Sequence, residues 1–422
     1  MAAVGRSSVV VVGGGVIGLA CAWELTRAGA SVTVVERDEV GSGVSRGNTG
    51  WVVPSLTFPL PAPGMVREGI SQLVTRGDAF VLRPSLDPAF VRWLWQFWRS
   101  SSSSRFDAGV RALLELNRRT LELYDGYHEA GIDFETHSTG LVVVARTNSG
   151  LEQYRRVFRR LRELGYEGGE PDELDRDELA KLEPALDRGN VVAGLHARVD
   201  RYVRPEELMD GLAKRLRDEG AQILEGCEVT DLRAVPEGWA LATDTGDVRA
   251  GKVVVAAGLP SAKLLGRRFG VRVAVQPARG YSVTIAGNGT PPRHALYLAE
   301  AKIGISPYAD EVRLAGVFEL GAAGPEAPAG AGERLLAAAR PYLAGWRPDA
   351  DRPVATWAGL RPATADGLPL IGALPGHPGL FVASGHGMLG VTLAPATAAL
   401  LAPLVLEGRS APELAPFAPG RH

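Results

Sequence analysis

The sequence predicts an α/β protein with two domains interleaved along the chain, one built on a parallel sheet and the other on an antiparallel sheet. Three patterns predict this. First, a β-branched run over residues 8–12 precedes glycines, a helical pattern and a second β-branched run over 31–35, which is the order of a βαβ unit. Second, another β-branched run occupies 248–256. Third, residues 271–285 and 295–318 show the period-two alternation of antiparallel strands.

The segments between these runs indicate helices and one further strand. Residues 16–28 place apolar side chains on one face, and Gly29 follows at the position where many helices end in a left-handed residue. Residues 221–232 have the composition of a strand. Further helices are predicted over 110–130, 153–164 and 205–219.

Composition excludes several classes of protein. A chain of 422 residues with 45% hydrophobic residues can bury a large core and divides into two or three domains. The formal net charge of −2 argues against a nucleic-acid partner, which would favour a basic excess. The two cysteines, Cys21 and Cys227, allow no disulfide framework and form no metal-binding spacing, so we expect no metal and a reducing, cytoplasmic compartment. Glycine is in excess, with 52 residues.

Two apolar segments raise the question of a leader or a membrane span. Arg6 and the apolar run after it resemble a signal peptide, but glycines interrupt the run and its pattern continues to Glu36, so we expect folded protein. Residues 380–406 lack Asp, Glu, Lys and Arg. Their glycines and prolines would leave backbone groups unpaired in lipid, which favours a buried loop followed by a buried helix.

A glycine motif follows the first predicted strand. Gly13, Gly15 and Gly18 form a Gly-x-Gly-x-x-Gly pattern that opens the helix. The first glycine permits a tight turn, the second lets the backbone approach a pyrophosphate, and the third allows close helix–strand packing. Glu36 ends the second strand, where a carboxylate accepts hydrogen bonds from ribose hydroxyls and repels a 2′-phosphate. The motif therefore predicts a dinucleotide site, without separating FAD from NAD.

Further segments carry a resemblance to a known family. They are Ser45-Arg-Gly-Asn-Thr-Gly50, Pro277-Ala-Arg-Gly-Tyr-Ser282, the stretch from Trp357 to Gly372, and Ser384-Gly-His-Gly-Met-Leu-Gly390. In this order and spacing they resemble the D-amino-acid-oxidase-like flavoenzymes. The similarity covers nearly the whole chain and is greatest to the bacterial D-amino-acid dehydrogenases, which also share the Trp-rich stretch at 93–98.

The resemblance implies a Rossmann-type FAD-binding domain interleaved with an α+β substrate domain built on an antiparallel sheet. The expected boundaries are 1–85, 190–270 and 350–422 for the first domain, and 86–189 and 271–349 for the second. It also implies non-covalent FAD, because neither cysteine lies where a covalent link would form. The implied cofactor-binding residues are Gly13, Gly15, Val16, Ile17, Gly18, Glu36, Arg37, Ser45, Asn48, Thr49, Gly50, Val229, Ala257, Gly258, Arg361, Gly385, Gly387, Met388, Leu389 and Gly390.

The implied reaction is oxidative deamination of an amino acid, expected to be D-configured, by hydride transfer from Cα to the flavin. Arg361 matches the arginine that binds the substrate carboxylate in glycine oxidases, although it could instead pair with Asp366. Tyr281 and His386 are the other catalytic candidates. A buried core tyrosine explains Tyr281 equally well, and His386 stands in a flavin loop where the chemistry needs no base. Met388 replaces a second arginine of glycine oxidases, which favours a more apolar side-chain pocket.

The electron acceptor and partners stay open at this stage. The alternatives to a dehydrogenase are a glycine- or sarcosine-type oxidase of secondary amines that produces peroxide, and the flavin subunit of an opine- or proline-type hetero-oligomer. The acceptor is accordingly a quinone or oxygen, and a homo-oligomer is a further possibility. The aromatic residues of 90–98 either form a peripheral membrane contact, at the inner face of the plasma membrane, or belong to a buried helix.

Overall fold

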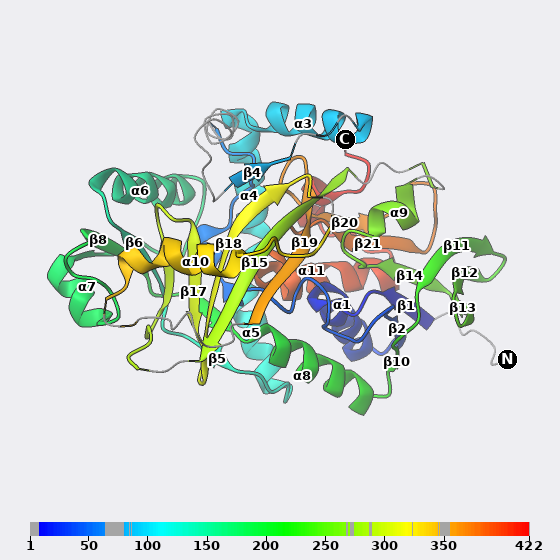
Figure 1. Ribbon diagram of the computed structural model, residues 1–422. Helices are drawn as coiled ribbons and strands as arrows, with labels where there is room; N and C mark the ends of the chain where they lie inside the picture. The colour runs from blue at the N-terminus through cyan, green and yellow to red at the C-terminus, as the bar shows by residue number, and fades with distance from the viewer. Residues whose placement is uncertain are drawn as a thin grey trace.

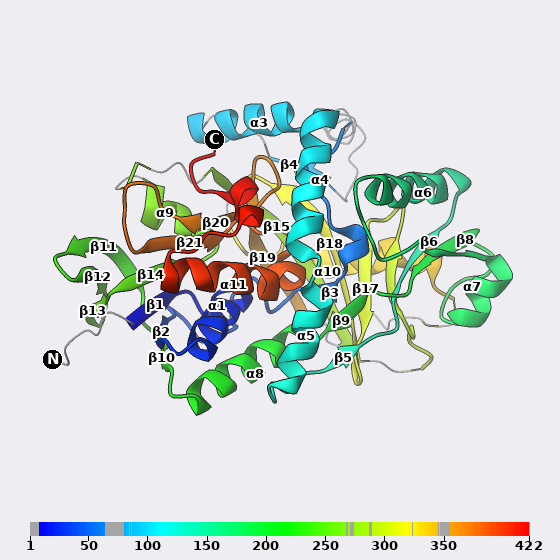
Figure 2. The same cartoon turned by 180° about the vertical axis from the view of Figure 1, so that it is seen from behind.

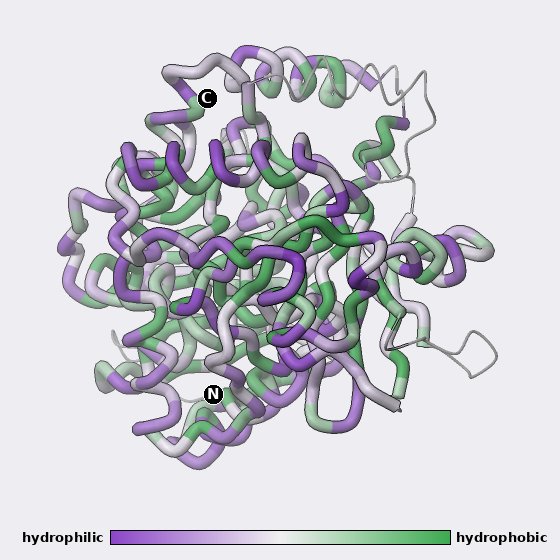
Figure 3. Tube along the Cα trace, turned by 90° about the vertical axis from the view of Figure 1, so that its left-hand side faces the viewer, coloured by the Kyte–Doolittle hydropathy of each residue, from purple (hydrophilic) through white to green (hydrophobic). Residues whose placement is uncertain are grey.

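A computed structural model describes residues 8–63, 80–83, 85, 87–266, 269–270, 274–286, 289–322, 324–344, 346 and 355–421. Two large sheets lie side by side, with helices against their outer faces (Figure 1). Apolar segments concentrate inside the molecule, and polar segments occupy the periphery (Figure 3). The mixed α/β class predicted from the sequence is confirmed.

The first sheet is parallel except at one edge. In the described residues it has six strands, and only β20 runs antiparallel to its neighbour. Val9 and Val11 of the first strand pack toward the helices, while Val10 and Val12 pack toward a small sheet on the other face, so the strand is apolar throughout. The order is β10 (Gln222–Leu224), β2 (Ser31–Val35), β1 (Ser8–Val12), β14 (Lys252–Val255), β21 (Leu380–Ser384) and β20 (Leu370–Ala373).

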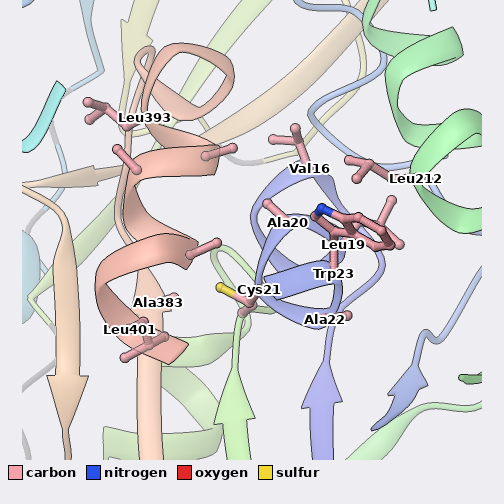
Figure 4. Packing of buried hydrophobic residues seen from close by; sticks show 14 of the residues in the cluster. Val16, Leu19, Ala20, Cys21, Ala22, Trp23, Leu212, Ala383, Leu393 and Leu401 are labelled. Carbon is pink, nitrogen blue, oxygen red and sulfur yellow. The ribbon is translucent and has the colours of Figure 1, made fainter. Parts of the chain in front are cut away.

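Helices α1 (Val16–Arg27) and α11 (Gly390–Glu407) cover the helical face of this sheet. Figure 4 shows Cys21 of α1 between the two helices, with Leu393 and Leu401 of α11 nearby. The expected left-handed residue after α1 is confirmed, since Gly29 has φ +88°. The small sheet on the opposite face comprises β11 (Val229–Val235), β12 (Gly238–Thr243) and β13 (Gly246–Ala250).

The second sheet is mainly antiparallel and has nine strands among the described residues. Two of its pairings, β6 with β16 and β4 with β18, are parallel. The order is β19 (Ala355–Thr364), β15 (Val275–Ala286), β18 (Glu311–Leu320), β17 (Ile303–Pro307), β16 (Ala295–Leu298), β6 (Leu141–Ala145), β8 (Ala193–Ala197) and β7 (Asp172–Asp175), and β4 (Phe80–Leu82) pairs with β18. A further small sheet has β3 (Trp51–Val52), β9 (Arg201–Val203) and β5 (Thr136–His137).

The remaining helices surround the second sheet and join it to the first. Seen from behind, α4 and α5 run between α11 and the second sheet (Figure 2). Helix α3 lies on the outside of the molecule above them. The bounds are α3 (Pro88–Ser100), α4 (Ser103–Asn117), α5 (Thr120–Glu129), α6 (Asn148–Glu163), α7 (Arg176–Leu182), α8 (Pro205–Asp218), α9 (Ser261–Gly266) and α10 (Ala331–Ala339), with 3₁₀ helices η1 (Pro54–Leu56), η2 (Arg340–Tyr342) and η3 (Pro412–Phe417).

Three expected elements are divided in the structure. The strand predicted over 248–256 is wrong as a single element, because β13 and β14 belong to different sheets and the chain turns between them at Gly251. The strand predicted over 221–232 is likewise divided into β10 and β11. The helix predicted over 110–130 is divided into α4 and α5, because a turn at residues 118–119 interrupts it. Apolar runs record burial and cannot locate such breaks.

The uncharged C-terminal segment forms strand β21, a glycine loop and helix α11. Within the described residues, one helix, Gly390–Glu407, is long and apolar enough to cross a membrane. Of its residues, 61% are buried in the protein, as in a core helix. The predicted domain boundaries stay predictions, but three strands belong to a different sheet from the one the boundaries assign: β4, β8 and β19 are all part of the second sheet.

Candidate active site

A cavity of about 1120 Å³ lies where the two sheets meet. Its lining comes from the carboxyl ends of β1, β2, β14 and β21, and from β17, β18 and β19 of the second sheet. Further residues come from η1, α4 and α6. The carboxyl edge of a parallel sheet is where α/β proteins usually bind ligands.

The glycine turn after β1 is packed too tightly for side chains. Gly13 has φ +115°, and a Cβ there would lie 2.6 Å from the Ala256 carbonyl oxygen. A Cβ on Gly18 would overlap the Gly13 carbonyl. The Gly15 position is different, since its nearest neighbour would be Ser45 Oγ at 3.5 Å, and Gly15 lines the cavity. The turn therefore leaves exposed backbone beside the first turn of α1.

This end of the cavity has two groups suited to a dinucleotide. Gly15 caps α1 without a side-chain hydrogen bond, and no acidic residue stands in the first turn, so the helix N-terminus favours a phosphate. The Val16 N–H contacts Ser45 Oγ at 3.3 Å. The Glu36 carboxylate lines the cavity and accepts from the N–H groups of Gly14 at 2.6 Å and Asp38 at 3.0 Å.

The loop at residues 45–50 is held by the second sheet. The Thr49 carbonyl accepts from the hydroxyls of Ser306 at 2.7 Å and Tyr308 at 2.9 Å. Arg313 donates to the carbonyls of Arg46 and Asn48, both at 3.0 Å. Tyr308 thus supports the loop and does not line the cavity.

Arg361 lies on β19 and lines the cavity. Its Nη1 donates to the Val317 carbonyl at 2.9 Å. The alternative pairing with Asp366 does not form, because Asp366 receives two hydrogen bonds from Arg421 at 2.8 and 3.0 Å. No carboxylate of the described residues pairs with Arg361. Burial lowers the pKa of Arg361 to about 10, so it is still charged at neutral pH.

Two backbone features place this guanidinium. Gly280 lies beside it on β15, and a Cβ there would overlap the guanidinium group. Val317 has φ +63°, which is rare for a β-branched residue, and it lies in a β-bulge where Val317 and Phe318 face Gly280. The bulge turns the Val317 carbonyl toward Arg361. No sequence pattern indicated that the Val317 carbonyl would bind Arg361.

Tyr281 does not line the cavity. It follows Gly280 on β15, so strand alternation directs it to the other face. Its hydroxyl donates to Glu319, a buried carboxylate that also accepts from Arg279 at 2.8 Å and Arg83 at 2.7 Å. Burial, together with the bond to Glu319, raises the pKa of Tyr281 to about 12. This hydroxyl belongs to an ionic network, and a catalytic role for Tyr281 stays a prediction.

His386 borders the cavity just before α11. Its Nε2 is 3.0 Å from Thr397 Oγ1, and burial lowers its pKa to about 3, so the ring is neutral. The loop around it has Gly385 at φ +79° and Gly387 at φ +57°, and leads to the N-terminus of α11. The N-terminus of α11 lacks a side-chain cap, as does that of α1, so two helix N-termini border the cavity.

The predicted cofactor-binding residues come together, apart from two. Gly18 and Gly50 lie behind the lining, and the other predicted positions line the cavity. Their contact with a cofactor stays a prediction. Residues that the sequence did not suggest include Trp51 and Trp357, whose rings lie against Gly304 and Gly47.

The acidic residues of the cavity lining gather at one end. They are Glu36, Asp38 and Glu228, all near the glycine turn or β11, where the basic residue Arg37 also lines the cavity. At the other end, Arg361 lies deep, and the rim has Arg156, Arg160 and Lys302. An elongated ligand with hydroxyls at one end and an anionic group at the other would match this distribution.

Comparisons with known proteins agree with this geometry. Residues 8–404 match the DAO family model, described as FAD dependent oxidoreductase. The chain is 33% identical over 415 residues to the D-amino acid dehydrogenase of Phenylobacterium zucineum strain HLK1, covering 96% of this chain and 95% of that one. It is 32% identical over 440 residues to D-amino acid dehydrogenase 2 of Ralstonia nicotianae, covering 98% and 100%.

Solved structures with the same fold are also found. Glycine oxidase from Geobacillus kaustophilus superposes with a TM-score of 0.75 and 27% identity, covering 98% of both chains. L-alpha-glycerophosphate oxidase from Mycoplasma pneumoniae, a structure with FAD bound, gives a TM-score of 0.73 at 19% identity over 94% of both chains, which shows the fold alone.

Proposed function

Since the chain belongs to the DAO family of FAD-dependent oxidoreductases, we propose that it oxidises the Cα–N bond of an amino acid and passes the electrons to a quinone. The observation that carries the proposal is Arg361, a guanidinium in the cavity without a carboxylate partner among the described residues. An α-amino acid would supply that carboxylate through two parallel hydrogen bonds.

FAD is the cofactor of this family, and the residues present fit it. Gly13, Gly15 and the N-terminus of α1 would hold the pyrophosphate, and the Glu36 carboxylate would accept from a ribose. The N-terminus of α11 would border the flavin. When bound, FAD supplies the two-electron oxidant that accepts hydride from Cα, leaving an imine that water hydrolyses to a 2-keto acid and ammonia.

The protein's own contribution would be positioning. Arg361 fixes the carboxylate and so limits the orientation of Cα, which is the main rate advantage when no residue reacts covalently. His386 is neutral and its Nε2 is engaged with Thr397, so it supports the loop before α11. We therefore assign no base; the amine would bind in its neutral form, and the imine nitrogen would release its proton to water.

Anaerobic mixing of the FAD-loaded protein with D-, L- and N-alkyl amino acids tests the proposal. At least one amino acid should bleach the flavin absorbance. An Arg361→Ala variant should lower the affinity for that amino acid by about 30-fold or more, corresponding to a lost contact of about 2–5 kcal/mol. Reduction by no amino acid, or normal affinity in the variant, would overturn it.

The acceptor is decided by a separate measurement. If the protein is an oxidase of glycine-like or secondary amines, turnover in air yields stoichiometric peroxide. If it is a dehydrogenase, turnover requires an added quinone and yields little peroxide. FAD binding without any turnover, restored by a partner subunit, would favour the hetero-oligomeric alternative.

Helix α3 supports a place at a membrane surface. Phe90, Trp93 and Phe97 are buried, while Val91, Trp95 and Trp98 are exposed by 52%, 51% and 61% and recur on the outer face. Arg92 and Arg99 flank them, and Arg99 lies 4.7 Å from the Trp95 ring centroid. Aromatic and basic residues on one face are typical of a helix that lies in the headgroup region.

We therefore propose peripheral binding to the inner face of the plasma membrane. The protein should co-sediment with vesicles of mixed anionic and neutral phospholipid. A Trp95→Ala/Trp98→Ala variant should remain in the supernatant while keeping its FAD. Equal sedimentation of both proteins, or of neither, would exclude this role for α3.

A further inference from the structure

We propose that the end of the cavity away from the glycine turn receives the substrate's side chain, and that the preferred substrates carry large aliphatic or aromatic side chains. This end, the apolar compartment, is lined by Phe58, Leu60, Phe80, Phe106, Val157 and Phe318. The inference rests on the proposed function, because it takes Arg361 as the carboxylate site.

The compartment is an aromatic surface, most of whose rings are only partly buried. Phe80 stacks on Phe318 with centroids 5.9 Å apart, and Phe58 and Phe106 lie 6.5 Å apart. Phe58, Phe80 and Phe106 are only half-buried although they line the interior cavity. Covering apolar surface removes it from water, which is favourable. An apolar group would therefore be favoured there over water.

The compartment is continuous with the carboxylate site. Phe318 directly follows Val317, whose carbonyl receives the Arg361 guanidinium at 2.9 Å. Leu60, Phe80 and Phe318 belong to one apolar cluster. The residue that holds the Arg361 guanidinium and an aromatic residue of the compartment are therefore neighbours on β18.

The compartment is also fixed in shape. A Cβ on Gly109 of α4 would lie 2.7 Å from Pro59 Cγ, and a Cβ on Gly367 would lie 2.7 Å from the Leu60 N. These close approaches hold the segment between Phe58 and Leu60 against α4 and the loop after β19. Preformed apolar pockets select ligands by size.

Polar alternatives fit less well. The acidic residues of the described lining lie at the opposite end, so a basic side chain has no partner in the compartment. Arg160, at the rim, is already paired with Asp107 and Glu163. An acidic side chain would meet cations at the rim, where Arg156 and Lys302 stand, and would leave the aromatic surface uncovered.

Flavin reduction by D-alanine, D-leucine, D-phenylalanine and D-glutamate, with the L-enantiomers alongside, tests the inference on the FAD-loaded protein. Leucine or phenylalanine should exceed alanine by at least about tenfold in kcat/KM, since one methylene in an apolar pocket is worth about 10- to 200-fold. A Phe58→Ala/Phe106→Ala variant should lose this preference, because its loss in kcat/KM should be larger for leucine and phenylalanine than for alanine. Val199→Ala, an exposed apolar residue outside the cavity lining, is the control.

Binding without reaction separates this inference from the proposed function. Phenylacetate should raise the melting temperature of the FAD-loaded protein more than acetate or glutarate, because a ligand that binds only the native state stabilises it. The Arg361→Ala variant should lose the shift. Should the double phenylalanine variant not fold, Val157→Phe, which fills the compartment, should selectively remove the response to phenylacetate.

The outcomes are distinct. A phenylacetate shift without amino-acid reduction would overturn the proposed reaction and leave the carboxylate-plus-apolar site standing. Reduction fastest with alanine or glutamate, or an equal loss for all substrates in the double variant, would overturn the inference while the reaction stands. Neither reduction nor a shift would overturn both.

Discussion

The two ends of the cavity are built in different ways. At the glycine turn, the ligand-facing surface is mostly backbone, and its shape follows from residues inside one βαβ unit, with Gly13 and Gly18 in mutual contact. At the substrate end, the surface consists of side chains from β4, α4, α6, β18, β19 and the segment after η1. A backbone surface cannot yield to an added atom, whereas a surface of side chains can be reshaped. The following predictions test this difference.

The largest effect is expected at the backbone end. Gly18→Val would place a side chain against the Gly13 carbonyl, where backbone must move, so the turn beside α1 would be lost. We expect the purified variant to hold less than about a tenth of the FAD of the parent protein, measured by flavin absorbance. Gly126→Ala in α5, where a Cβ meets nothing within 4 Å, is the control and should keep its FAD. Full FAD content in the valine variant would contradict the assignment.

A smaller and more selective effect is expected at Gly280. In Gly280→Ala the added Cβ meets the end of a flexible side chain, so Arg361 would move while the fold stays intact. The value of kcat/KM for amino acids should fall about 10- to 100-fold, mostly through KM, as expected for a displaced binding group. The melting temperature should change little.

A double-mutant cycle isolates this positioning role. In an Arg361→Ala background, Gly280→Ala should have no further effect on kcat/KM, because the group that it displaces is gone. Additive losses would mean that Gly280 acts on something other than the guanidinium.

The stability that Asp200 contributes beside η1 should depend on pH. Asp200 is fully buried beside η1, where it accepts from the hydroxyl and the N–H of Ser55, and burial raises its pKa to about 7. A raised carboxyl pKa means that the folded protein keeps a proton which the unfolded chain, with a pKa near 3.8, releases. The stability contributed by this group is therefore full at about pH 4 and is lost as pH rises toward 7.

Asp200→Asn keeps a neutral, isosteric group there. The gain in unfolding free energy of this variant over the parent protein, measured with urea, should be larger at pH 7 than at pH 5. The increase should be up to about 2 kcal/mol, because each pH unit of that range is worth about 1.4 kcal/mol. Ser55→Ala, which removes a partner without removing the titration, should keep the parent's pH slope. A difference that does not change between pH 5 and pH 7 would exclude Asp200 as the titrating group.

The same contrast explains what the sequence could predict. The βαβ unit, Glu36 and the glycine loop before α11 are local patterns with fixed backbone geometry, and they lie where the sequence places them. The break between β13 and β14 depends on which sheet each strand joins, which no local pattern records. Val317 and Phe106 have ordinary sequence surroundings; the bulge and the aromatic surface exist only after distant elements pack together.

The smallest kinetic effect is expected at Tyr281, and it sharpens the comparison within one strand. Gly280 and Tyr281 are neighbours on β15, yet Gly280 lies against the Arg361 guanidinium whereas the Tyr281 hydroxyl binds Glu319. In Tyr281→Phe, Glu319 still accepts from Arg279 and Arg83, so its charge stays compensated. The lost hydrogen bond should cost about 1–3 kcal/mol of unfolding free energy, while kcat and KM stay within about threefold of the parent values. Stopped-flow flavin reduction together with urea unfolding measures both quantities. A hundredfold loss in the reduction rate at unchanged stability would instead place the Tyr281 hydroxyl at the reacting atoms, because a group that acts only through folding cannot produce that combination.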